Sequence, residues 1–147
     1  MFAADPNSFI EVSGGTLTVN AYGDGIDSNG SLNLSGGSIT LRGPTAGDTA
    51  VLDYASEGII SGASFVGTGS SMMAQSLNSD TQGVIALGVG SQSAGTTATI
   101  SASDGTALLS VTPELDYAIV IFSCPEMKKE ESYTVTIGSV SKDFTAN

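Results

Sequence analysis

The sequence predicts an all-β fold, a short right-handed parallel β-helix of about three coils with a β-strand cap at its C-terminal end. A short repeat of alternating apolar and small polar residues recurs around Ser13-Gly14-Gly15, Ser35-Gly36-Gly37 and Ser61-Gly62-Ala63, with spacings of 22 and 26 residues. Repeats of this length are typical of solenoids, in which successive coils stack. The 19 glycines and the absence of Trp and His favour short strands and tight turns.

Residues 1–81 are expected to form the coils, each with two short strands on either side of the glycine turn. Right-handed winding is the sense that crossover connections between parallel strands prefer. Stacking in register would place Val12, Leu34 and Ile60 in one interior column and Leu17, Ile39 and Phe65 in another. The four extra residues of the third coil are expected between residues 44 and 49.

Residues 82–147 are expected to form the cap of the same domain, because the open end of a solenoid exposes strand edges and apolar interior. Alternating or apolar segments predict antiparallel strands here, and Asp104-Gly105 is a hairpin turn signal. The predicted strands are Val84–Val89, Thr97–Ala102, Thr106–Val111, Tyr117–Phe122 and Tyr133–Ile137.

Charge and cysteine usage exclude several classes of protein. Fifteen acidic and four basic residues give a net charge of −11, which argues against binding nucleic acid or an anionic membrane through a basic patch. No stretch is apolar enough to span a bilayer. The single cysteine, Cys124, lies in an apolar run and predicts a buried, inert thiol. Residues 1–4 lack the features of a signal peptide, so the chain reads as cut from a longer protein or as an exported protein after signal removal. An extracellular or bacterial cell-surface location and a monomeric state are expected.

An acidic ladder is the strongest functional signal. Asp5, Asp27 and Asp53 occupy the same position in three successive repeats, and neighbouring strands lie about 4.8 Å apart, so these carboxylates would repel one another without a cation. Asp24 and Asn29 add oxygen ligands within residues 23–30. Oxygen donors in flexible geometry suit calcium, although the segment is not an EF-hand loop. The alternative, which the spacing leaves open, is that these side chains cap β-turns.

Several motifs together resemble the bacterial extracellular carbohydrate-binding domains catalogued as the domain of unknown function DUF4353. They are residues 23–30 (GDGIDSNG), Ser35-Gly36-Gly37, Gly43-Pro44, Leu52-Asp53-Tyr54, Ser61-Gly62, Met73-Ala74-Gln75 and the ending at 133–138. The resemblance covers most of the chain and implies a parallel β-helix, bound calcium and binding of acidic plant polysaccharide such as polygalacturonate, or of cellulose. It makes Asp24, Asp27 and Asp53 the expected calcium ligands. Family members usually have more coils than this chain.

Four further residues are candidate ligand contacts. Tyr22 and Tyr54 flank the acidic turns and could stack on sugar rings, although tyrosines near turns are more often packing residues. Arg42 is the only basic residue in the coils, and Asp48, in the extra loop, could pair with it.

We expect no enzymatic activity. A pectate-lyase-like reaction would need a basic residue beside the calcium, and Arg42 is the single candidate. Glycoside hydrolysis would need a carboxylic acid in an apolar pocket, which the sequence does not indicate. The alternative to polysaccharide binding is a bacterial surface adhesin that binds a host protein.

Overall fold

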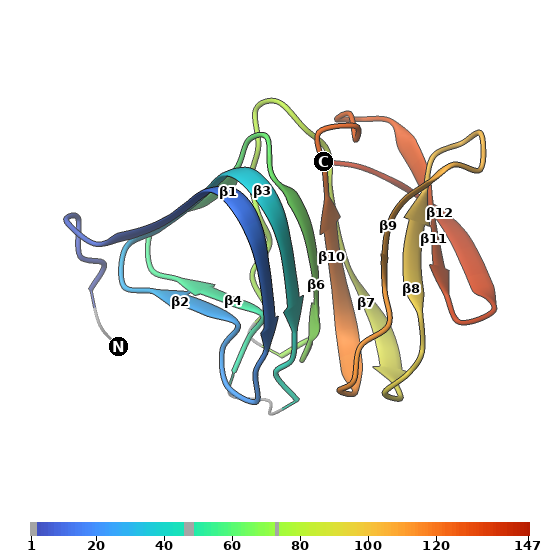
Figure 1. The fold of residues 1–147 in the computed structure, drawn as a ribbon, viewed down its shortest axis with the longest axis horizontal. Coiled ribbons are helices and arrows are strands. Elements are labelled where there is room, and N and C mark those ends of the chain that lie inside the picture. The colour runs from blue at the N-terminus through green and yellow to red at the C-terminus, as the bar shows by residue number, and fades with distance from the viewer. Residues whose placement is uncertain (1–2, 46–48, 73) are drawn as a thin grey trace.

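A computed structural model describes residues 3–45, 49–72 and 74–147, and these residues form twelve strands and no helix (Figure 1). The predicted all-β class is confirmed. In chain order the strands are β1 (Phe9–Asn20), β2 (Ile26–Ser28), β3 (Ser31–Arg42), β4 (Leu52–Tyr54), β5 (Gly58–Ile60), β6 (Ser64–Gly69), β7 (Val84–Gln92), β8 (Ala98–Ser101), β9 (Ala107–Val111), β10 (Tyr117–Ser123), β11 (Ser132–Ile137) and β12 (Val140–Thr145).

Parallel pairing of β1, β3 and β6 places the repeats one above another. Val12 lies beside Leu34, and Leu34 lies beside Ile60. In the second column Leu17, Ile39 and Phe65 are neighbours. The 22- and 26-residue alignment of the repeats and both interior columns are therefore confirmed. On the other side of this core, β2 and β4 form a separate parallel pair.

The sheets are mixed, and the described strands do not by themselves show the closed parallel solenoid expected from the sequence. The main sheet has the order β1-β3-β6-β10-β7, with β5 also paired to β3, and β10 runs antiparallel to both of its neighbours. The expected glycine turn between two strands is present in the third repeat, where β5 ends at Ile60 and β6 begins at Ser64, but it is wrong at the Ser-Gly-Gly motif of the first two repeats. Strands β1 and β3 continue through it, with irregular register around Ser13, because Gly15 and Gly37 adopt positive φ and allow a strand to bend without ending.

The main sheet carries a hydrophobic core on each face, and the main-sheet residues of the second core come from β6, β10 and β7. Alternation along β10 sends Ile119 and Ile121 into the first core, which the β2–β4 pair closes, and Val120 and Phe122 into the second. The second core lies against the four-stranded sheet β12-β11-β8-β9, on the right of Figure 1. The C-terminal strands are antiparallel as predicted, and Gly105 has the positive φ of the expected β8–β9 hairpin.

Cys124 is fully buried in the second core, so the prediction of a buried thiol is confirmed. Burial first, and then Glu126, raises the pKa of this thiol to about 11. At pH 8 we therefore expect a thiol-reactive dye to label the folded protein much more slowly than the unfolded protein. In the folded protein the thiol is protonated, and the dye cannot reach it. Absorbance of the released dye in buffer and in denaturant measures the two rates. Equal rates would contradict a buried thiol.

Candidate metal centre

Strands β2 and β4 place two carboxylates side by side. Ile26 pairs with Leu52 and both point into the first core, so the next residue on each strand, Asp27 and Asp53, points outward. Asp27 and Asp53 are themselves partners in the register. The two rungs of the acidic ladder predicted from the second and third repeats are thus neighbours, about one strand spacing apart.

A third carboxylate, that of Asp24, comes from the turn before β2. One of its oxygens accepts a 2.8 Å hydrogen bond from the backbone N–H of Ala50, and Gly25 N–H donates to the Ala50 carbonyl at 3.1 Å. The turn before β2 therefore packs closely on the turn before β4, and a Cβ at Gly25 would lie 2.4 Å from the carbonyl oxygen of Val51. This close packing is what directs Asp24 toward the two strands.

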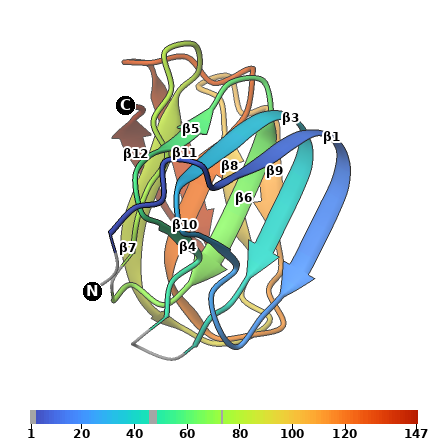
Figure 2. The same ribbon diagram turned by 90° about the vertical axis from the view of Figure 1, so that its left-hand side faces the viewer.

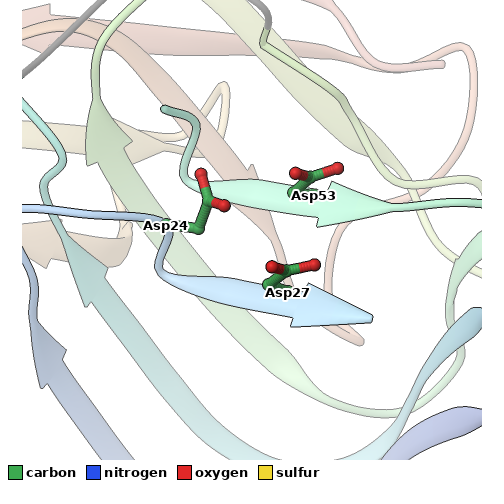
Figure 3. A group of neighbouring side chains, drawn as sticks. All are labelled: Asp24, Asp27 and Asp53. Atoms are coloured by element: carbon green, nitrogen blue, oxygen red, sulfur yellow. The ribbon is translucent and has the colours of Figure 1, made fainter. Parts of the chain in front are cut away.

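Asp24, Asp27 and Asp53, hereafter the acidic triad, each offer one carboxylate oxygen, and these oxygens all lie within 4.8 Å of one another. Figure 3 shows the three side chains close together, Asp27 on β2, Asp53 on β4 and Asp24 on the turn before β2. Burial, followed by the charges of Asp24 and Asp27, raises the pKa of Asp53. Three like charges this close favour a bound cation or a retained proton. Carboxylate oxygens in an open, flexible arrangement suit calcium, which takes six to eight oxygen ligands.

The predicted ladder is wrong at Asp5. The backbone N–H of Asp5 donates to the carbonyl of Asn29, so Asp5 is not in register with Asp27. Its carboxylate accepts hydrogen bonds from Asn7 N–H at 2.9 Å and the Ser8 hydroxyl at 2.7 Å, and these bonds lower its pKa. Asp5 therefore makes the side-chain turn that the sequence left open as the alternative. Asn29 lies just beyond β2, with its residue exposed and its carbonyl bonded to Asp5.

The two tyrosines that flank the acidic turns differ in their surroundings. Tyr54 is partly buried against the first core, its hydroxyl donates to the Ser76 carbonyl, and burial raises its pKa. Its ring also covers Gly58, where a Cβ would lie 2.5 Å from a ring carbon. Tyr54 thus makes the packing contacts that the sequence left open as the alternative, and its stacking on a sugar ring stays a prediction. Tyr22 is 76% exposed and lies two residues before Asp24.

Arg42 lies on a different face from the acidic triad. It ends β3, and because Leu41 points into the first core, Arg42 points away from that core, whereas the triad lies on the outer side of the β2–β4 pair. Its guanidinium donates to the Asn20 side chain at 3.5 Å, and its Nε is buried without a hydrogen-bond partner among the described residues. Arg42 therefore does not lie beside the triad, and its role as a ligand contact stays a prediction. Asp48 falls in 46–48, outside the described residues, so its pairing with Arg42 stays a prediction.

A polar hollow of about 290 Å³ is a feature that the sequence analysis missed. It is lined by segments far apart in the chain, among them Thr45, Ser70, Gln92, Asp116 and Tyr117. Asp116 accepts a hydrogen bond from Ala94 N–H there. No local motif marks such a site, since its lining comes together only when the main sheet forms.

Comparison with known proteins adds no relative: no family model, no curated protein and no solved structure matches this chain. Among the described residues, no helix is present that is long and apolar enough to cross a membrane.

The raised pKa of Asp53 predicts a pH-dependent effect of Asp53→Asn. When the pKa of a carboxyl group is higher in the folded than in the unfolded state, the protein loses stability as the pH rises through the folded-state pKa. In chelator at pH 7 we therefore expect Asp53→Asn to raise the melting temperature, because one of three mutually repelling charges is removed. Near pH 3, where the carboxyl is protonated in both states, the two proteins should melt together. Thermal unfolding across this pH range measures the difference, and a difference that does not change with pH would contradict a raised pKa.

Proposed function

We propose that this protein is a calcium-dependent, non-catalytic carbohydrate-binding domain for acidic plant polysaccharide such as polygalacturonate. The acidic triad is the observation that carries the proposal, because three carboxylate oxygens within 4.8 Å of one another form a ready set of calcium ligands at the surface. Asp27 and Asp53 are exposed and Asp24 is partly exposed, so an ion held there would be open to a ligand.

The charge of the protein makes calcium necessary for this function. A chain with a net charge of −11 repels a polyuronate, and screening over a Debye length of about 8 Å does not remove repulsion at contact distance. Calcium takes six to eight oxygens, so three carboxylates leave about half of its coordination positions to water or to uronate oxygens. A calcium ion at the triad would therefore bridge carboxylates of the protein and of the polysaccharide.

Tyr22 is the aromatic residue best placed to add a sugar contact. It is exposed and lies in the same turn as Asp24. A tyrosine ring can stack on the apolar face of a sugar while its hydroxyl bonds to a sugar oxygen.

We interpret the parallel part of the structure as a short right-handed β-helix, with β1, β3 and β6 on one side of each coil and β2 and β4 on the other. The offsets of 22 and 26 residues between paired strands support this interpretation. The resemblance to the DUF4353 carbohydrate-binding domains supports the same fold, the calcium and an extracellular or cell-surface location.

Calorimetric titration with polygalacturonate, in calcium and in excess chelator, tests the proposal. Binding in calcium alone supports it. If the folded protein binds no polysaccharide in either condition, the proposal fails, and the surface adhesin for a host protein becomes the better hypothesis.

A further inference from the structure

Among the described residues, strand β1 pairs only with β3, so its other edge is open at one end of the main sheet. In Figure 2 the strands β6, β3 and β1 follow one another, and β1 is the last in the row. Its 12 residues correspond to an edge of about 40 Å at 3.3 Å per residue. The N–H and C=O groups on this edge are a template for another strand.

Both interior columns are also less well buried at this end of the main sheet. Ile10, Val12, Leu17 and Val19 are the β1 members of the first core, and all four are only partly buried. Their partners on β3 are Leu32, Leu34, Ile39 and Leu41, and each of these is at most 1% exposed. A further strand paired with β1 would bury these four β1 side chains as fully as their partners on β3.

The β1 edge lacks the protection found on β12, which is one of the two edge strands of the four-stranded sheet. On β12, Lys142 pairs with the buried Val135 and therefore lies on the core face, where an inward charge discourages a further strand. Strand β1 contains one charged residue, Glu11, and neither lysine nor proline.

The sequence of β1 is complementary to itself. Counted outward from Gly14-Gly15, Val12 matches Leu17 and Ile10 matches Val19, so an antiparallel pair of β1 strands related by a two-fold axis at these glycines aligns interior residues with interior residues. The same register places Glu11 opposite Thr18, so no like charges face each other across the pair. The irregular segments around Ser13 also meet, because they lie on the axis.

We propose that a second copy of this chain covers the β1 edge, forming a two-fold dimer through antiparallel β1–β1 pairing in this register. The two main sheets then join into one continuous sheet, and the partly exposed columns of both copies become interior. This state differs from the monomer expected from the sequence, and it does not depend on the proposed carbohydrate binding.

Light scattering coupled to size-exclusion chromatography tests the dimer across a dilution series. We expect twice the chain mass of 14.7 kDa at high concentration. Thr18→Glu, an exposed outward position, places like charges opposite each other twice and should weaken the dimer on the order of tenfold. Thr18→Lys should strengthen it, and the double variant Glu11→Lys with Thr18→Glu should restore it.

Thr145→Glu on β12 is the matched control, since it adds the same charge at an exposed position far along the chain and should leave the dimer unchanged. Circular dichroism of each variant checks that the fold is retained. A monomer at every concentration overturns the proposal. So does a dimer that responds equally to Thr18→Glu and Thr145→Glu, because that result shows a general charge effect and not the β1 register.

Discussion

Binding of polygalacturonate is expected in calcium and is expected to disappear in excess chelator. The reason is electrostatic: without the ion, the exposed carboxylates of the acidic triad face the carboxylates of the polymer, and with the ion both sets become ligands of one centre. Titration calorimetry at fixed ionic strength measures the loss. Magnesium should replace calcium poorly, because it demands stricter geometry and gives up its water reluctantly.

Asp27→Asn and Asp5→Asn form a matched pair for this experiment. Both remove one carboxylate at the same position of successive repeats, but Asp27 belongs to the triad, whereas Asp5 bonds to Asn7 and Ser8. Asp27→Asn should lower the affinity for calcium on the order of tenfold or more, because this affinity follows the number of charged ligands. Asp5→Asn should leave it unchanged. Equal effects of the two substitutions would show that general negative charge, and not the triad, binds the ion.

Gly36→Ala is expected to destabilise the fold strongly. A Cβ at Gly36 would lie 2.4 Å from the carbonyl oxygen of Ser13 on the neighbouring strand β1, and that backbone can move only if the β1–β3 pairing shifts. Overpacking of this kind costs about 2 kcal/mol or more. Denaturant unfolding, at a dilution where the chain is monomeric, measures the change in the free energy of unfolding.

Gly14→Ala is the control for Gly36→Ala, because Gly14 occupies the same position in the preceding repeat. A Cβ there would meet nothing within 4 Å, and its φ is not in the positive range. We expect no loss, or a gain of up to about 1 kcal/mol from the lower conformational entropy of the unfolded chain. Similar losses at Gly14 and Gly36 would contradict the stacking of these two repeats.

Most of the structural features that could be predicted came from the sequence repeat. Alternation and the 22- and 26-residue spacings were enough to align Leu34 with Ile60 and Asp27 with Asp53, because parallel strands in register convert sequence offset into neighbours. The same logic failed at Asp5. Regular stacking requires a strand, but residues 3–8 lie outside any strand, and the bond from Asp5 N–H to the Asn29 carbonyl holds Asp5 out of register with Asp27.

The remaining differences depend on contacts between distant segments. Asp24 joins the triad through the Ala50 backbone, and the Tyr54 hydroxyl bonds to Ser76, and neither contact leaves a periodic signal in the sequence. Strand β10 was predicted as a strand, but its insertion beside β6 depends on the exposed β6 edge, which no local pattern reports.

The place of β10 between β6 and β7 also affects how the protein can fold during synthesis. Strand β7 precedes β10 in the chain, yet it reaches the main sheet only through β10. A nascent chain that ends before Ser123 therefore has coils with an open β6 edge and a β7 without its partner. Long-range pairing of this kind is slow, so we expect the main sheet to close only after β10 has been synthesised.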